Sequence, residues 1–450
     1  MSLLKIISGK YLRFKLGLTP QQNLFYGFLS YVLIGTLLLS IPWLQRTSVS
    51  ILDNLFIATS AVSTTGLVTV SVFDSYNFFG QFVVMVLFQL GGIGYLTFTT
   101  FMILSTTRKF THWHQNLLKT EFTLPVTIKI KDFLRSVVIF TIIMEVLGAI
   151  LFFIAFKKEG MAIGEALWSS IFHSISAFCT AGFSLFNSGF VDYSDNILVN
   201  TTISILAIAG SLGFIVVTDF VLFFRKKAHR LSFTTKIVFY GFLALLSFGF
   251  IFFYAYEPTI SALQGRERIL TAFFQSMTAM TTVGFNTVDF GAFLLPMLLV
   301  TIFLMYIGAS PSGTAGGMKI TTLTAVFAIM KSRLRNSKRI TFLGRGIPYE
   351  RLYIATSSFI FYTSLIAFGT FILTFTEPFE FERILFEVAS ALGTVGLSTG
   401  ITGDLTATGK LMIIVLMFIG RLGVLTFGLA IWSKTQNDNE DEIVKDDIAV

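Results

Sequence analysis

The stretch Val62-Ser63-Thr64-Thr65-Gly66 has three further copies along the chain, and every copy ends in Thr-x-Gly. Leu or Phe follows each of the four glycines, which are 116, 102 and 112 residues apart. A recurrence at this spacing indicates four repeats of one structural unit of about 110 residues. The other copies are Phe178-Cys179-Thr180-Ala181-Gly182, Met280-Thr281-Thr282-Val283-Gly284 and Leu392-Gly393-Thr394-Val395-Gly396.

The composition is that of a membrane protein. Of the 450 residues, 54% are hydrophobic and only 13% are charged, whereas soluble proteins average about 25% charged residues. Several apolar stretches exceed the ~20 residues that a membrane-spanning helix needs. The single cysteine, Cys179, excludes an intrachain disulfide.

Each repeat is predicted to contain a span, a half-helix too short to cross the bilayer, the Thr-x-Gly turn and a second span. The predicted first spans are residues 24–44, 137–156, 237–256 and 352–375, and the half-helices are 53–61, 164–177, 268–279 and 381–392. The second spans are predicted at 78–104, 197–224, 293–330 and 410–432. The predicted fold class is an all-α polytopic membrane protein, with eight spans in four pseudo-symmetric span–pore-helix–span repeats around one central pore.

This pattern also divides the chain into segments. Residues 1–23 are the expected N-terminal segment, and residues 433–450 are the expected acidic tail. The four repeats are expected at residues 24–107, 137–224, 237–330 and 352–432, with an intramembrane loop at 308–319.

The distribution of basic residues predicts the orientation. The two terminal segments and the three loops between repeats hold 24 Lys and Arg residues, whereas the opposite face holds seven. By the positive-inside rule both termini are cytoplasmic, and the half-helices enter a cell membrane from outside. The net charge of +8 therefore reflects topology and does not indicate a nucleic-acid partner. The acidic outer segments have two open interpretations, a negative mouth that concentrates cations and a solvated surface.

Four turns around one axis would stack rings of oxygen atoms that replace the hydration shell of a cation. The threonine offers a carbonyl and a hydroxyl, and the glycine adopts positive φ without placing a Cβ in the ion path. The C-terminal end of each half-helix adds partial negative charge. A single copy would be read as an ordinary turn, but four copies favour a cation site. The candidate ligands are Thr64, Thr65, Gly66, Thr180, Ala181, Gly182, Thr282, Val283, Gly284, Thr394, Val395 and Gly396.

The second apolar stretch of the third repeat is interrupted by glycines and a proline. Pro costs about 3 kcal/mol and Gly about 1 kcal/mol in a helix interior, so we expect a loop inside the membrane. A small, flexible segment in an ion path is a candidate gate; the alternative is a kink or a packing notch. The interruption reads Gly308-Ala309-Ser310-Pro311-Ser312-Gly313-Thr314-Ala315-Gly316-Gly317-Met318-Lys319.

Arg421 falls in the middle of the last predicted span, where a cation is costly and usually functional. We expect it at the depth of the loop, bonded to loop carbonyls or placing positive charge in the pore, so that it holds the gate shut. The alternative is a structural pair with a carboxylate such as Asp219 or Glu145. Lys319 either acts in the same way or extends to the cytoplasm.

These motifs resemble the Trk/Ktr/HKT superfamily of potassium transporters over about residues 24–432, and the chain looks like the KtrB-like membrane subunits of the bacterial Ktr type. The extra N-terminal spans of the Trk type are not seen. The resemblance implies that the Thr-x-Gly turns are a K+ selectivity filter, with Gly66 accompanying selectivity for potassium over sodium. It also implies that residues 308–319 form the gate. The second glycine of the potassium-channel pattern Thr-Val-Gly-Tyr-Gly is missing, which implies fewer well-defined ion sites.

The resemblance further implies potassium uptake by a homodimer in membrane lipid, with one pore per protomer and a cytosolic ring of nucleotide-binding regulatory subunits (KtrA-like). No cofactor and no metal other than K+ at the filter are expected in this chain. It lacks a P-loop, so nucleotide is expected only in the partner subunit. Stimulation by Na+ is implied by the family alone.

The residues support two other classes of function to different degrees. A sodium-permeable or ion-coupled secondary transporter is suggested by the broken helix. An intramembrane enzyme or receptor is disfavoured, because no nucleophile–base pair, HExxH motif or metal cluster lies in the predicted spans.

Overall fold

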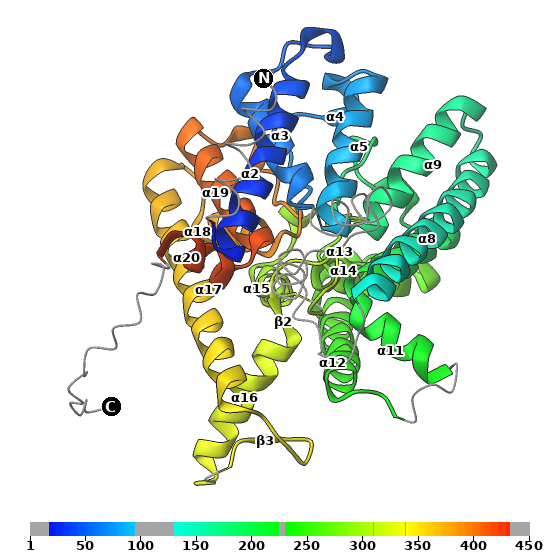
Figure 1. Cartoon of the computed structure of the whole chain (residues 1–450). Coiled ribbons are helices and arrows are strands. Elements are labelled where there is room, and N and C mark those ends of the chain that lie inside the picture. The colour runs from blue at the N-terminus through cyan, green and yellow to red at the C-terminus, as the bar shows by residue number, and fades with distance from the viewer. Residues whose placement is uncertain (1–17, 95–129, 225–229, 309, 338, 433–450) are drawn as a thin grey trace.

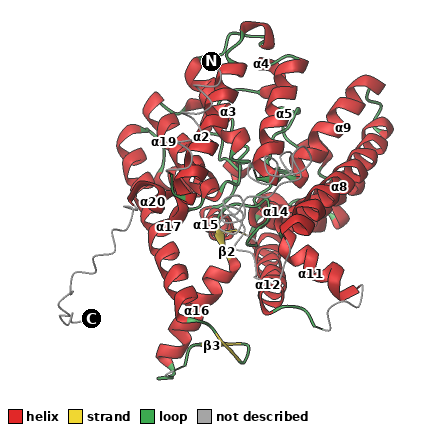
Figure 2. Cartoon of the chain, viewed as in Figure 1, coloured by secondary structure: helices red, strands yellow, loops and turns green. Residues whose placement is uncertain are grey.

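The structure, a computed structural model, describes residues 18–94, 130–224, 230–308, 310–337 and 339–432. The described chain is mostly helical, with short strands β1 (Ile307–Gly308) and β2 (Met318–Lys319) paired in parallel, and β3 (Thr341–Phe342) and β4 (Arg345–Gly346) paired antiparallel (Figure 2). Most of the predicted N-terminal segment, most of the first basic loop, residues 95–107 of the first repeat and the acidic tail lie outside the described residues.

The helices follow one order in each repeat, a long helix and then a half-helix. The long helices are α2 (Pro20–Leu39), α8 (Ile130–Lys158), α12 (Phe233–Tyr256) and α17 (Tyr349–Thr376). The half-helices are α3 (Ile51–Val62), α9 (Ile163–Phe178), α14 (Gly265–Thr281) and α18 (Phe381–Gly393).

A second apolar stretch completes each repeat. It comprises α5 (Phe78–Ile93) in the first, α10 (Ile197–Ser211) and α11 (Phe214–Phe224) in the second, α15 (Leu295–Tyr306) and α16 (Ile320–Leu334) in the third, and α19 (Ala407–Leu422) and α20 (Val424–Trp432) in the fourth. The connections hold the short helices α4 (Val72–Ser75) and α13 (Pro258–Ser261).

Side-chain caps determine where several helices begin. Thr19 and Gln22 form a reciprocal capping box at α2, Ser50 caps α3, and Thr406 caps α19. Each such cap contributes about 1 kcal/mol by satisfying a backbone N–H at the helix start. Among the half-helices only α3 begins with such a cap, since no side chain of the described residues caps the start of α9, α14 or α18.

The helices pack in a scheme that closes on itself. In each repeat the half-helix packs against the long helix before it and the helix after it, as in α2–α3–α5. The helix after it also contacts the next half-helix: α5 contacts α9, α10 contacts α14, α15 contacts α18, and α19 returns to α3 (Figure 1). Lys410 on α19 and Asp53 on α3 strengthen the last contact, with 2.8 Å between Nζ and Oδ1. The four half-helices therefore surround one axis.

Four of the described helices are long and apolar enough to cross a membrane, or six if two bent helix pairs each count as one span. The long helices expose apolar side chains along their length. On α8 these include Ile139, Ile142, Ile143, Val146, Leu147, Ile150 and Ile154. An exposed apolar surface of this kind suits contact with lipid.

The second apolar stretches differ from the continuous spans predicted at 197–224 and 410–432. Helices α10 and α11 meet at 94°, and α19 and α20 meet at 99°. Gly213 (φ +83°) and Gly423 (φ +87°) lie at these breaks, and Gly94 (φ +86°) ends α5. Glycine alone reaches positive φ without strain, so it ends a helix where another residue would continue it. Hydropathy does not register such a break, because the residues on both sides are apolar.

The third repeat is interrupted differently. Helix α15 ends at Tyr306 and the chain becomes helical again at Ile320. The pairing of β1 with β2 brings the two ends of the intervening loop together. The described part of this loop is thus a closed excursion between two helices.

The two bend glycines predict different responses to the same substitution. In Gly213→Ala, the new Cβ would lie 2.6 Å from Pro311 O, whereas in Gly423→Ala its nearest atom, Thr426 Oγ1, is 3.8 Å away. Both variants carry left-handed backbone strain of about 1–2 kcal/mol, but only Gly213→Ala must also displace the loop. We expect Gly213→Ala to lower the thermal unfolding midpoint in detergent by several degrees more than Gly423→Ala. Equal shifts would contradict the packing of the loop against Gly213.

Candidate functional site

The four half-helices end in one kind of hydrogen-bonded cap. At the end of α3, Thr64 N donates to Ala61 O at 3.0 Å and Thr65 N donates to Ser60 O at 2.8 Å. These are the two bonds of a Schellman motif, which closes a helix with a residue in the left-handed conformation. The second of them recurs at the other three turns, as Ala181 N–Ser176 O (2.8 Å), Val283 N–Thr278 O (3.3 Å) and Val395 N–Ser390 O (2.8 Å).

A threonine occupies the left-handed position in every cap. The φ angles are +52° at Thr64, +51° at Thr180, +57° at Thr282 and +48° at Thr394. Glycine is the usual residue there, and a strained conformation of this kind costs about 1–3 kcal/mol per residue. Threonine at all four positions indicates that its side chain is needed, since backbone geometry alone would favour glycine.

The glycines that follow form a closed ring of contacts. Their φ angles range from +69° to +91°. A Cβ added to any of them would lie closer than 3.0 Å to the carbonyl oxygen of the residue before the glycine in the next repeat. Only glycine fits at these positions. The contacts run from Gly66 to Ala181, from Gly182 to Val283, from Gly284 to Val395, and from Gly396 back to Thr65.

The threonine hydroxyls of the ring fall into two pairs. Thr180 Oγ1 lies 3.1 Å from Thr314 Oγ1, and Thr282 Oγ1 accepts from Gly316 N at 3.2 Å. Thr64 Oγ1 and Thr394 Oγ1 are buried without a hydrogen-bond partner among the described protein atoms. A buried hydroxyl left in this way costs about 1–3 kcal/mol, so both oxygens are suited to bind a ligand.

The chemistry of the ring suits an alkali cation. Its carbonyl and hydroxyl oxygens are neutral, hard ligands, which replace water around such an ion. The C-terminal ends of α3, α9, α14 and α18 add partial negative charge there. Across the described ranges, no group of three or more His, Cys, Asp or Glu side chains is arranged to hold a metal ion.

A second set of hydroxyls, which the sequence analysis did not single out, supports each turn from behind. Two of them accept from the N–H of their own ring glycine at 3.1 Å, and the other two donate to the carbonyl of the residue after it, at 2.8 and 2.6 Å. Aligning the repeats on the glycine reveals the set, because each member lies six residues before it. The members are Ser60, Ser176, Thr278 and Ser390.

The interrupted segment of the third repeat lies against the threonine side of the ring. Thr314 donates from its backbone N to Gly210 O at 3.0 Å and from Oγ1 to Phe178 O at 3.2 Å. Gly316 packs against Thr394, since a Cβ added to Gly316 would overlap the threonine hydroxyl. Of the predicted gate residues, Ala309 lies outside the described part of the chain.

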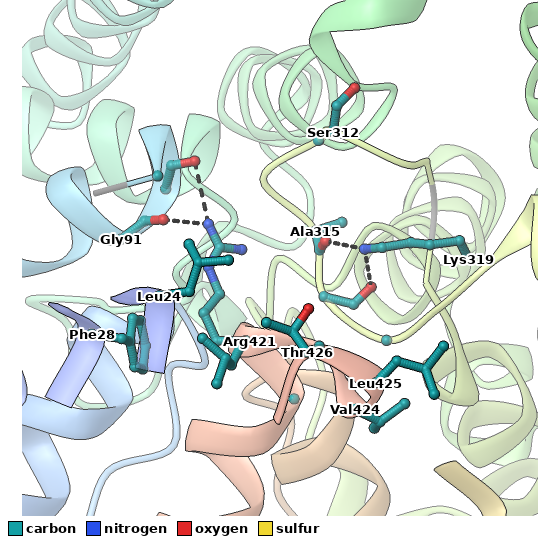
Figure 3. A pocket seen from close by; sticks show the side chains of 18 of the residues that line it. Leu24, Phe28, Gly91, Ser312, Ala315, Lys319, Arg421, Val424, Leu425 and Thr426 are labelled. Carbon is teal, nitrogen blue, oxygen red and sulfur yellow. Dashed lines mark hydrogen bonds between the residues drawn. The ribbon is translucent and has the colours of Figure 1, made fainter. Parts of the chain in front are cut away.

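Two cations hold this loop. Arg421 donates to Thr314 O from Nη1. From Nη2 it donates to Gly91 O and Gly92 O (Figure 3). Lys319 Nζ donates to Ala315 O at 2.6 Å and Gly316 O at 2.9 Å. Arg421 therefore contacts a loop carbonyl directly, and Lys319 bonds to the loop that precedes it.

The two carboxylates considered as alternative partners of Arg421 have other contacts. Asp219 accepts from Ser232 N at 2.7 Å, and Glu145 lies 3.9 Å from the sulfur of Cys179. Cys179 is buried, and its sulfur fills the space beside Gly92.

A cavity of about 340 Å³ opens beside the loop. Arg421, Lys319, Phe28 and Tyr362 line it together with residues 91–94 (Figure 3). The loop contacts the ring and also lines this cavity, so it stands between the two.

The fold and the ring define a helical membrane protein of the cation-transport class. Residues 19–441 match the TrkH family, which is described as "Cation transport protein". The chain belongs to this family, so it is a transporter and not an enzyme, and the resemblance to the Trk/Ktr superfamily is confirmed.

Relatives extend over nearly the whole chain. The chain is 35% identical over 435 residues to Ktr system potassium uptake protein B of Bacillus subtilis, covering 96% of each. It is 35% identical over 419 residues to potassium/sodium uptake protein NtpJ of Enterococcus hirae, covering 91% of this chain and 92% of NtpJ. Its fold is similar to the crystal structure of the potassium transporter TrkH from Vibrio parahaemolyticus, with a TM-score of 0.69, 21% identity, and 90% and 84% of the two chains covered.

The ring geometry predicts that an alanine substitution has very different effects at two glycines, one in the ring and one in a half-helix. In Gly284→Ala, the new Cβ would overlap Val395 O at a φ of +79°, whereas Gly164 has no atom within 4 Å of its Cβ position. We expect Gly284→Ala to abolish most cation uptake and to destabilise the fold by at least the ~1–3 kcal/mol of left-handed strain. Gly164→Ala should leave both unchanged. Uptake by whole cells and thermal unfolding in detergent measure the two effects, and wild-type values for Gly284→Ala would exclude the ring geometry.

Proposed function

We propose that this chain is the ion-translocating subunit of a Ktr-type system for potassium uptake across the cell membrane. The observation that carries the proposal is the closed ring of four glycines, each preceded by a threonine in the left-handed conformation. The names of the relatives in Bacillus subtilis and Enterococcus hirae support potassium as the ion.

The ring acts as the selectivity filter. Carbonyl oxygens of the residues at and before each glycine, with the threonine hydroxyls, replace the water around K+. Potassium loses its hydration more readily than the smaller Na+, and a ring whose backbone is fixed by caps and glycine contacts favours the larger ion. The proposed ligands are Thr64, Thr65, Gly66, Thr180, Ala181, Gly182, Thr282, Val283, Gly284, Thr394, Val395 and Gly396.

The loop at residues 308–319 is the gate. It occupies two ring hydroxyls through Thr314 and Gly316, and Arg421 and Lys319 hold its carbonyls while placing positive charge beside the ion path. Opening requires the loop to leave the ring, so the number of hydrogen bonds to these two cations sets how readily it moves.

We further propose eight membrane crossings. They comprise the four long helices, the two bent pairs, the span predicted at 78–104, which includes α5, and the interrupted pair α15–α16. Both termini then lie in the cytoplasm and the half-helices enter from outside, as the asymmetry of basic residues supports. In this orientation the C-terminal end of each half-helix points inward, and its partial negative charge favours a cation in the pore.

A homodimer with one pore per protomer, docked on a cytosolic ring of nucleotide-binding subunits, completes the proposal. The word "system" in the names of the Ktr relatives supports further subunits. Nucleotide binds the partner only. The name of NtpJ, which includes sodium, supports Na+ as a stimulating ion.

The central test is rescue of a potassium-uptake-deficient host. We expect the chain, expressed with a regulatory subunit, to restore growth at low potassium and to take up rubidium. Rescue should be weaker without the regulatory subunit. Protein present in the membrane with no rescue in either condition would rule out potassium uptake.

The second candidate is a sodium-permeable or ion-coupled transporter, which the name of NtpJ favours. Replacing potassium by sodium in the uptake assay separates the two. Uptake of both ions at equal rates would establish the second candidate in place of a potassium-selective filter.

Arg421→Ala tests the gate. Removing the guanidinium releases Thr314 O and takes a positive charge from the ion path, so we expect rubidium uptake to rise several-fold. Arg383→Ala is the control, because Arg383 pairs with Glu380 where both are exposed to solvent. Unchanged or lower uptake by well-inserted Arg421→Ala protein would argue against a barrier role.

A further inference from the structure

The four half-helices carry different side chains at one shared position, nine residues before the ring glycine. The four residues, Ile57, His173, Gln275 and Glu387, are all fully buried. Three of them form hydrogen bonds with the segment that follows the ring glycine, and these bonds hold that segment against the half-helix. We call His173, Gln275 and Glu387 the braces.

The braces contact matching places in their repeats. His173 Nε2 lies 3.1 Å from both Ser184 Oγ and Leu185 N, two and three residues after Gly182. Gln275 Nε2 donates to Thr287 Oγ1 at 2.8 Å, three residues after Gly284. Each brace therefore ties its half-helix to the chain that leaves the ring.

Glu387 makes the most bonds of the three. Its Oε1 accepts from Ser398 Oγ at 2.5 Å and from Thr399 N at 3.1 Å, and its Oε2 accepts from Thr402 Oγ1 at 2.9 Å. Three donors thus converge on one carboxyl group. An ionised carboxylate, which only accepts hydrogen bonds, satisfies all three.

The other equivalent positions carry no charge. His173 Nε2 accepts from the backbone N–H of Leu185, so its proton is on Nδ1, which lies 2.7 Å from Ser169 O and donates to it. An imidazole with this pattern is the neutral tautomer. Gln275 is an amide and Ile57 is aliphatic. Glu387 is therefore the one carboxyl group among four pseudo-equivalent positions around the ring.

Within the part of the chain that the structure describes, Glu387 has no cation partner. The ion pairs found within the described ranges are Arg383–Glu380 and Lys410–Asp53. A buried charge without a partner is unfavourable, and hydrogen bonds offset only part of that free energy. Its bonded neighbours Ser398 and Thr399 directly follow the fourth turn, which places the carboxylate behind the ring.

We propose that the cation in the ring is the counter-charge of Glu387, whose carboxylate determines how tightly the ring holds a monovalent cation. This inference rests on the proposed transport function. Two unit charges about 10 Å apart at an effective dielectric constant of about 20 change a binding constant roughly tenfold. The braces His173 and Gln275 fix their turns without contributing charge.

Glu387→Gln removes the charge and keeps the shape of the side chain. We expect the rubidium concentration for half-maximal uptake to rise roughly tenfold, with the maximal rate nearly unchanged. A purely structural role would instead lower the maximal rate or the amount of folded protein. The control is Glu380→Gln, an exposed carboxylate at the start of the same half-helix, whose charge is screened by salt. An unchanged half-saturation in Glu387→Gln would overturn the inference.

The internal repeats allow the charge to be moved. Among the described residues, Gln275 Oε1 has no hydrogen-bond partner, and the Thr287 hydroxyl can turn to donate to a carboxylate there. In the double variant E387Q/Q275E the charge sits at the equivalent position of the third turn. We therefore expect the rubidium concentration for half-maximal uptake to return toward the wild-type value. Weak uptake in both the single and the double variant would show a role confined to local hydrogen bonds and would overturn the inference.

If the Glu387→Gln protein fails to fold, the single variant Gln275→Glu, which retains Glu387, provides a second test. The added carboxylate should lower the half-saturating rubidium concentration, and an unchanged or higher value would contradict the inference. Absence of uptake by the wild-type chain would defeat the proposed function itself, whereas wild-type uptake with unaltered variants would defeat only the role of Glu387.

Discussion

The structure depends on a helix cap that places threonine where glycine would be easier. Each half-helix must stop before the ring, turn by positive φ and still present a side-chain oxygen, and Thr64 shows how one residue meets all three demands. The strain of about 1–3 kcal/mol per threonine is held by surrounding bonds, because Ser60 supports the turn from behind and Gly66 packs against the next repeat. The ring is therefore rigid because its parts constrain one another.

Much of the fold could be predicted from the sequence, because the Thr-x-Gly copies and the long apolar runs report the repeats directly. The half-helices were placed within a few residues. The bends at Gly213 and Gly423 were not predicted, since apolar residues on both sides mask a break in the backbone. The left-handed threonines could not be predicted either, because that position ordinarily favours glycine. The set containing Ser60 and the three braces forms no motif in any single copy, and it becomes visible only when the four copies are aligned on the glycine.

The third repeat differs from the others in one consequential way. Where Gly91, Gly210 and Gly420 pack against the ends of the half-helices in their own repeats, Gly308 packs against its own loop. The loop uses hydroxyls of the ring through Thr314 and Gly316, so the proposed gate and the proposed filter share hydrogen-bonding groups. In the proposed mechanism, a change in the ion content of the ring and a movement of the loop would be linked through these threonines.

The contact between α19 and α3 has a consequence for biosynthesis. Lys410 and Asp53 are 357 residues apart in the chain, and Gly396 completes the circle against Thr65. A nascent chain is synthesised from its N-terminus. The contact of the first turn with Gly396 can therefore form only after almost the entire protein has been made. Bringing together residues this far apart in the chain costs loop-closure entropy. A chain that lacks the fourth turn therefore lacks the contact of Gly396 with Thr65 that closes the ring.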